Sequence, residues 1–231
     1  MKNKILVMLF ALTVAAGSLT GCSGEEKKEE AVAEESVEET ESGNEEAVVM
    51  PLYPLESAQD ALADGGYSVY FTAENLISEG EGYALDVEVF EYDRYEKEAI
   101  EGLKAGSQIQ ICQETVTVET VEFDEESGYV YINGTIEENG YELCEEDGLY
   151  RSNSMVGYPM YYSVGRITIP VSAEATFEDQ SKVDYGEEGV VYTYDEMFDA
   201  IRNDTGVFGA NSTVITVRGG EIVQIIRYWV P

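Results

Sequence analysis

Cysteine and carboxylate side chains are the groups in this sequence that could do chemistry. The chain has three cysteines, 47 acidic residues and no histidine. Without histidine, Ser-His-Asp and Cys-His catalysis and nearly every catalytic zinc site are excluded. The side chain that usually titrates near neutral pH is also missing. An enzyme built from this sequence would have to use carboxylates, tyrosine, lysine or a hard cation.

The first cysteine, Cys22, follows a segment with the features of an export signal. Lys2 and Lys4 form a short positively charged region at the start of the sequence, and residues 5–16 form an unbroken apolar stretch after it. A membrane-spanning helix needs about 20 apolar residues, so this stretch is too short for one. It fits the hydrophobic region of a signal peptide, because small residues follow it.

The four residues Leu19-Thr20-Gly21-Cys22 resemble the lipobox of bacterial lipoproteins. The resemblance implies that the sulfur of Cys22 carries a diacylglyceryl group and that signal peptidase removes residues 1–21. One acyl chain alone attaches a protein only marginally, at about 0.8 kcal/mol per buried CH₂, whereas two or three chains hold it stably. The resemblance therefore predicts a lipid-anchored protein on the extracytoplasmic face of the cell membrane. The alternative is an ordinary signal peptide with a cysteine at this place by chance.

Residues 22–51 have the composition of a spacer. Glutamate, serine, alanine and glycine dominate, and aromatic residues are absent. Such a segment cannot bury enough apolar surface to offset its ordering entropy, and glutamates four residues apart repel each other along a helix. We expect a disordered acidic tether with a random-coil span of roughly 30 Å, followed by one folded domain at residues 52–231. A division of this domain near residue 150 is the alternative.

The formal net charge of −34 limits the partners of the chain. Nucleic-acid binding depends on cationic contacts to phosphates, so no nucleic acid is expected as a partner. Direct docking on an anionic lipid surface is disfavoured for the same reason, and the membrane is expected as a partner only through the lipid anchor. The acidic surplus keeps the domain soluble and attracts cationic partners.

The other two cysteines, Cys112 and Cys144, each end a segment of alternating apolar residues. If these segments are neighbouring strands, the two side chains could face each other and form a disulfide, which is possible outside the cytoplasm. Two small buried thiols fit the pattern equally well. A catalytic cysteine is the least favoured interpretation, because no histidine is available to activate it.

Acidic and tyrosine-rich segments complete the candidate sites. The acidic runs at residues 124–126, 145–147 and 187–188 lack the ligand spacing of a calcium loop, so no metal site and no cofactor are predicted. Glycosidases need two carboxylates about 5–9 Å apart, and this many acids supply such pairs by chance. Tyrosines near residues 129–131, 158–162 and 192–194 could stack against sugars, or pack with buried rings and solvated hydroxyls.

The elements that must position these groups are mostly strands. Alternating segments rich in Val, Ile, Tyr and Thr are separated by turns containing glycine and acidic residues. They predict a mainly β domain, a small barrel or sandwich of antiparallel strands with one or two short helices. The expected strands are residues 67–73, 83–92, 107–112, 114–123, 129–137, 165–177 and 190–194, and a C-terminal pair.

The C-terminal pair forms the clearest hairpin, because Gly219-Gly220 suits a two-residue turn with positive φ angles. One helix is expected to start at Thr193 as N-cap, with Glu196 completing a capping box. A shorter one is expected at residues 94–103. The pairs expected across the hairpin turn are Arg218 with Glu221, Val217 with Ile222, Thr216 with Val223, and Val214 with Ile225.

The spacing of Ile100, Leu103, Gly106 and Ile109, together with the C-terminal hairpin, resembles uncharacterised secreted lipoproteins of Gram-positive bacteria. We expect a cell-envelope lipoprotein whose domain binds or scaffolds and does not catalyse, with wall glycan or an envelope protein as its partner. Two alternatives stay open. One is a carboxylate-based hydrolase of envelope glycans, and the other is an acidic accessory or inhibitor subunit of a basic envelope protein.

Overall fold

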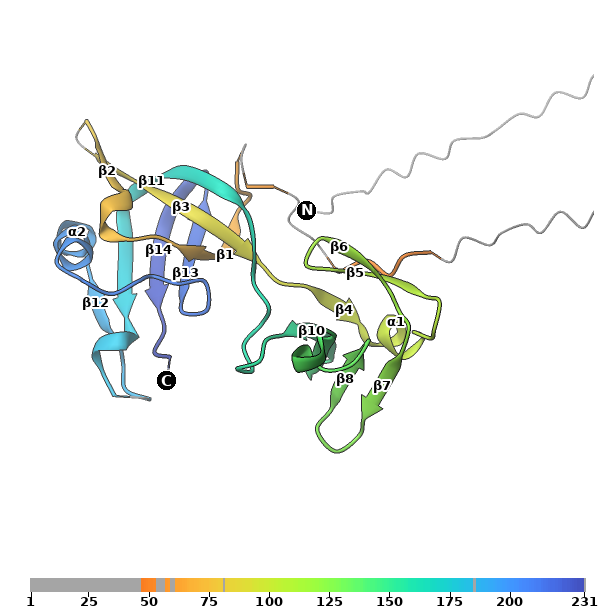
Figure 1. Cartoon of the computed structure of the whole chain (residues 1–231). Coiled ribbons are helices and arrows are strands. Elements are labelled where there is room, and N and C mark those ends of the chain that lie inside the picture. Colours follow the sequence, from red (N-terminus) through yellow and green to blue (C-terminus); the bar gives the residue numbers. More distant parts are fainter. Residues whose placement is uncertain (1–46, 53–56, 59–60, 81, 185, 231) are drawn as a thin grey trace, which may run out of the picture. The chain divides into compact units, whose positions relative to one another are not determined.

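The computed structural model describes residues 47–230 except residues 53–56, 59–60, 81 and 185 (Figure 1). The predicted signal peptide, Cys22 and the predicted tether up to residue 46 therefore lie outside the described residues.

The described chain is mainly β, which confirms the predicted fold class. Its strands are β1 (Gly65–Tyr70), β2 (Leu76–Glu79), β3 (Gly82–Glu91), β4 (Arg94–Glu96), β5 (Gln108–Ile111), β6 (Glu114–Thr117), β7 (Val121–Asp124), β8 (Tyr129–Ile132), β9 (Tyr141–Glu146), β10 (Leu149–Asn153), β11 (Tyr162–Asp179), β12 (Val190–Tyr192), β13 (Thr213–Arg218) and β14 (Glu221–Arg227). The helices are α1 (Lys97–Glu101) and α2 (Tyr194–Arg202), with short 3-10 turns η1 (Ala73–Asn75), η2 (Ile136–Glu138) and η3 (Gln180–Lys182).

Five strands close into the predicted small barrel. Their order is β11-β14-β13-β1-β3, and β3 pairs again with β11, while β2 and β12 extend the sheet at its edges. The β13-β1-β3-β11 part is a Greek key, and five-stranded Greek-key barrels are the architecture of the OB-fold. One architecture hosts many functions, so it assigns none by itself.

The barrel differs from the prediction at one pairing, because β11 and β14 run parallel. Parallel neighbours need a long crossover connection, which here contains α2, as is common for such connections. β11 can pair with three strands, β3, β12 and β14, because it is long. Its first half pairs with β3 and its last residues pair with β14, with a register shift between Val171 and Thr176. Figure 1 shows β11 as a long curved strand.

Residues 92–161 form an insertion between the barrel strands β3 and β11, which we call the inserted region. It contains a five-stranded sheet of order β4-β10-β9-β8-β7 and the β5–β6 hairpin. Its apolar side chains form a hydrophobic core that is distinct from the barrel core. The segment before the barrel also contacts it, because Val49 donates a backbone hydrogen bond to Gln108 and accepts one from Gln110.

The C-terminal hairpin confirms part of the predicted register. Gly219 and Gly220 both have positive φ angles, and the two pairs next to the turn are as predicted. The inner pairs are wrong by one residue, since Thr216 lies opposite Gln224 instead of Val223. The register shifts between Thr216 and Val217, and a β-bulge of this kind cannot be read from alternation alone.

Both expected helices are present in the described chain. The main helix, α2, begins after Thr193 and buries Met197, Phe198 and Ile201, as its apolar stripe predicts. The shorter helix is limited to α1, because Arg94–Glu96 forms β4 and pairs with β10. Edge pairing with a tertiary neighbour overrides the helix propensity of these residues.

Candidate functional site

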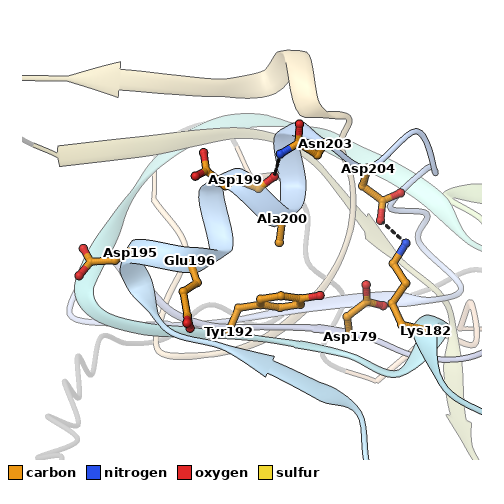
Figure 2. A pocket seen from close by; sticks show the side chains of 9 residues that line it. All are labelled: Asp179, Lys182, Tyr192, Asp195, Glu196, Asp199, Ala200, Asn203 and Asp204. Atoms are coloured by element: carbon orange, nitrogen blue, oxygen red, sulfur yellow. Dashed lines mark hydrogen bonds and ion pairs between the residues drawn. The ribbon is translucent and has the colours of Figure 1, made fainter.

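A pocket of about 540 Å³ lies beside α2, between this helix and the chain ends of β11 and β12 (Figure 2). We call it the α2 pocket. Most of its lining side chains are charged, which distinguishes it from the apolar barrel core. The lining residues are Asp179, Lys182, Tyr192, Asp195, Glu196, Asp199, Ala200, Asn203 and Asp204.

The first turn of α2 is held by its own N-terminal residues. The Glu196 carboxylate accepts hydrogen bonds from the backbone N–H of Thr193 at 3.0 Å and from its hydroxyl at 2.8 Å. These bonds lower the pKa of Glu196. Because the apolar stripe of α2 faces the barrel core, Asp195 and Asp199 remain exposed on the helix surface that borders the pocket.

An aromatic ring forms part of the pocket floor. Figure 2 shows the Tyr192 ring lying across the pocket beneath Ala200. Tyr192 stacks on the buried Phe177 of β11, with ring centroids 5.5 Å apart. The ring is therefore held by core packing on one side and borders the pocket, where the face of a tyrosine can attract a cation.

A buried arginine organises the far end of the pocket. Arg227 on β14 is 4% exposed, and its Nε donates to Asp179 at 2.9 Å while its Nη2 donates to both Asp179 and Asp204. The guanidinium also lies over the Phe208 ring, 4.4 Å from its centroid. Bidentate geometry and stacking are interactions that arginine makes and lysine cannot reproduce.

Asp204 links this buried pair to the open part of the pocket. Its carboxylate also contacts Lys182 Nζ at 2.7 Å, and Figure 2 shows this contact at the pocket edge. The hydrogen bond from Arg227 is the main cause that holds the pKa of Asp204 far below its usual range, with Lys182 adding to it. Asp204 thus stays ionised at physiological pH.

The charges of the α2 pocket favour cation binding over proton transfer. Five carboxylates line the pocket. Two cations oppose them, since Lys182 also lines the pocket and Arg227 lies behind it. A glycosidase general acid needs a carboxyl group with a raised pKa. The shifts at Glu196 and Asp204 are in the opposite direction.

The structure places Cys112 in a turn and Cys144 in a strand of the five-stranded sheet. Cys112 follows β5 in the turn to β6, whereas Cys144 is in β9, and both thiols are free. Burial raises the pKa of the Cys112 thiol to about 12 and also raises that of Cys144. Because the thiolate is the nucleophile, neither side chain is in a setting that activates it.

Two of the three acidic runs make structural contacts within the inserted region. At the β7–β8 turn, Asp124 accepts hydrogen bonds from Glu126 and Ser127. At the end of β9, Glu145 pairs with Lys97 and Glu146 pairs with Arg151. Within the described ranges, no group of three or more cysteine and acidic side chains is placed to hold a metal ion.

The tyrosines do not form a broad stacking surface in the described part of the chain. Tyr228 is the one with an exposed side chain, and the others that the structure describes are buried or half-buried. Of the predicted stacking candidates, Tyr192 is the one that lines the α2 pocket.

Sequence reasoning missed the ion-pair network of Asp179, Asp204 and Arg227. These residues are far apart along the chain, so no local motif joins them. One signal was available, since Arg227 ends a strand of mostly apolar residues and a charge in such a position needs a partner when it is buried.

In the ranges that the structure describes, no helix is long and apolar enough to cross a membrane. No family model matches the chain, and no curated protein or solved structure is significantly similar to it.

Proposed function

We propose that this protein is a lipid-anchored envelope lipoprotein whose barrel binds a positively charged group in the α2 pocket. The observation that carries the binding role is the combination of a tyrosine floor with a surplus of carboxylates in one cavity. Ammonium and guanidinium groups are attracted both by carboxylates and by aromatic faces. The ligand class is therefore an amine, or a lysine or arginine side chain of a partner protein.

The network around Arg227 supports binding because it holds part of the site rigid before a ligand arrives. Asp179 and Asp204 are fixed by hydrogen bonds, and the Tyr192 ring is fixed by stacking on Phe177. A preorganised site loses less conformational entropy on binding. Asp195 and Asp199 on the α2 surface make no ion pair within the described residues, so their charge is available to a ligand.

Calorimetric titration with spermidine tests the binding role at two salt concentrations. Replacing both Asp195 and Asp199 with Asn is expected to weaken binding about fivefold to tenfold, because exposed charge pairs contribute up to about 1 kcal/mol each. The matched control is Glu125→Gln with Glu126→Gln in the β7–β8 turn, which removes the same charge at a distant exposed place. Equal weakening in both double variants would show that spermidine responds to overall charge and not to the pocket.

The anchor has its own test. Mass spectrometry of the mature N-terminus is expected to find Cys22 carrying a diacylglyceryl group after removal of residues 1–21. Cys22→Ala is expected to leave the protein unlipidated and release it from the membrane fraction. A native protein with a free Cys22 thiol would refute the anchor and leave the spermidine result untouched.

A further inference from the structure

Asp93 joins the two places where the chain crosses between the barrel and the inserted region. It is 1% exposed and lies between β3 and β4, where the chain leaves the barrel. Its carboxylate accepts a hydrogen bond from the hydroxyl of Tyr162, at 2.9 Å, where β11 re-enters the barrel. It also accepts one from the backbone N–H of Cys112, at 2.5 Å. A single side chain therefore ties both crossings to the β5–β6 turn.

No cation neutralises this carboxylate within the described residues. The titratable and charged groups around it are those of Glu91, Arg94, Tyr95, Cys112 and Tyr162. Arg94 pairs instead with Glu91 at 3.8 Å and lies over the Tyr92 ring. A buried carboxylate held by neutral donors alone loses its hydration without gaining an ion pair.

The buried setting of Asp93 favours its neutral form more than water does. Burial raises the pKa of Asp93, and interactions with Cys112, Tyr162 and Tyr95 oppose part of this shift. Burial also raises the pKa of Tyr95 and Tyr162, and that of the Cys112 thiol to about 12, so these three stay neutral. The pKa of Glu91 is shifted in the same direction as that of Asp93, because burial raises it too.

Asp93 and its neighbours Tyr95, Cys112 and Tyr162 form a cluster that also contains a hydrogen-bond acceptor for a protonated Asp93. The Tyr95 hydroxyl donates to the carbonyl oxygen of Gln110 at 2.6 Å and interacts with Asp93 as well. Because its hydrogen is used on Gln110, the Tyr95 oxygen can accept a hydrogen bond from a protonated Asp93. The neutral carboxyl group can therefore be fully bonded in the closed cluster.

We propose that Asp93 is a proton-operated latch, closed when its carboxyl group is neutral and loosened toward a solvated state when that group ionises. The latch holds the Cys112 turn and the start of β11 against the β3–β4 crossing. Acidification of the medium around the envelope then stiffens the junction between the barrel and the inserted region. Nothing in this device depends on the α2 pocket or its ligand.

The test is urea unfolding of the folded chain from about pH 4, near the pKa of an unfolded Asp, to about pH 8, in high salt to screen the general repulsion among the acids. The urea midpoint of the unmodified protein is expected to fall as the pH rises. Asp93→Asn is expected to flatten this dependence. Tyr162→Phe is expected to move the fall of the urea midpoint to higher pH, because the ionised Asp93 carboxylate loses one hydrogen-bond donor.

Glu91→Gln is the control, because it removes the other carboxyl group with a raised pKa and should leave the contribution of Asp93 in place. If Asp93→Asn does not fold, Tyr162→Phe and a carbon-13 NMR titration of the Asp93 carboxyl group decide the question. An Asp93 that titrates at or below its usual value overturns the latch. So does an Asn variant that lowers the midpoint equally at every pH, because that result describes a purely structural contact.

Discussion

Arg227 and Asp179 face each other in register across β14 and β11, the parallel pair of the closed barrel. The ion pair therefore bridges the two strands whose pairing depends on the long α2 connection. Through Asp204 it also reaches the loop that follows α2. The same side chains thus hold the barrel together and shape one end of the α2 pocket.

Replacing Arg227 with Met is expected to destabilise the protein by about 3–5 kcal/mol, because it leaves the buried Asp179 carboxylate without a cation and leaves Asp204 with Lys182 alone. Urea unfolding at neutral pH measures this change. Arg218→Met is the matched control, since Arg218 is exposed beside the hairpin turn and should cost less than about 0.5 kcal/mol. Similar losses in the two variants would contradict the assigned role of the network.

The ion pairs of Asp204 predict a loss of stability in acid. Its pKa is lowered in the folded state, so the stabilisation is present above the unfolded value of about 4 and is lost as the pH falls below it. Asp204→Asn is expected to be less stable than the unmodified protein at pH 7, with the difference shrinking below about pH 4. Thermal unfolding over this range measures both proteins, and a gap that stays constant down to pH 2 argues against the ion pairs.

The N-terminal cap of α2 links helix stability to the pocket. Thr193→Ala removes the hydroxyl that donates to Glu196, and it is expected to lower the melting temperature by about 2–4 °C. Thr205→Ala, in the exposed loop after α2, serves as control and should leave the melting temperature nearly unchanged. Calorimetry checks both, and an unchanged melting temperature for Thr193→Ala would mean that the cap contributes nothing measurable.

Gly140 is predicted to be the least replaceable glycine of the inserted region. A Cβ atom at this position would lie 2.1 Å from the backbone oxygen of Gly134, where no side chain can move aside. Gly140→Ala is therefore expected to cost about 3 kcal/mol or more. Gly148→Asn is the contrast, because its position has open space and a left-handed backbone that Asn tolerates. Urea unfolding that ranks the Asn variant below the Ala variant would refute this account.

Local patterns predicted the elements that depend on near neighbours. The α2 capping box needs only Thr193 and Glu196, which are three residues apart, and the hairpin turn needs only Gly219 and Gly220. Alternation of apolar residues predicted most strands, because side chains on a strand face opposite sides in turn. The register predicted for the hairpin on the far side of Val217 from the turn was wrong, because a bulge depends on how both strands pack.

By itself, the sequence determined a mainly β domain, its clearest hairpin and helix, and a strongly acidic surface. These properties follow from the types and short-range spacing of residues. The tertiary structure alone decided that β11 and β14 run parallel and that Asp179, Asp204 and Arg227 meet behind the α2 pocket. It also decided that Asp93 is buried between Tyr162 and Cys112. Such contacts join residues far apart in the chain, and their energies depend on burial that only the closed barrel and the inserted region create.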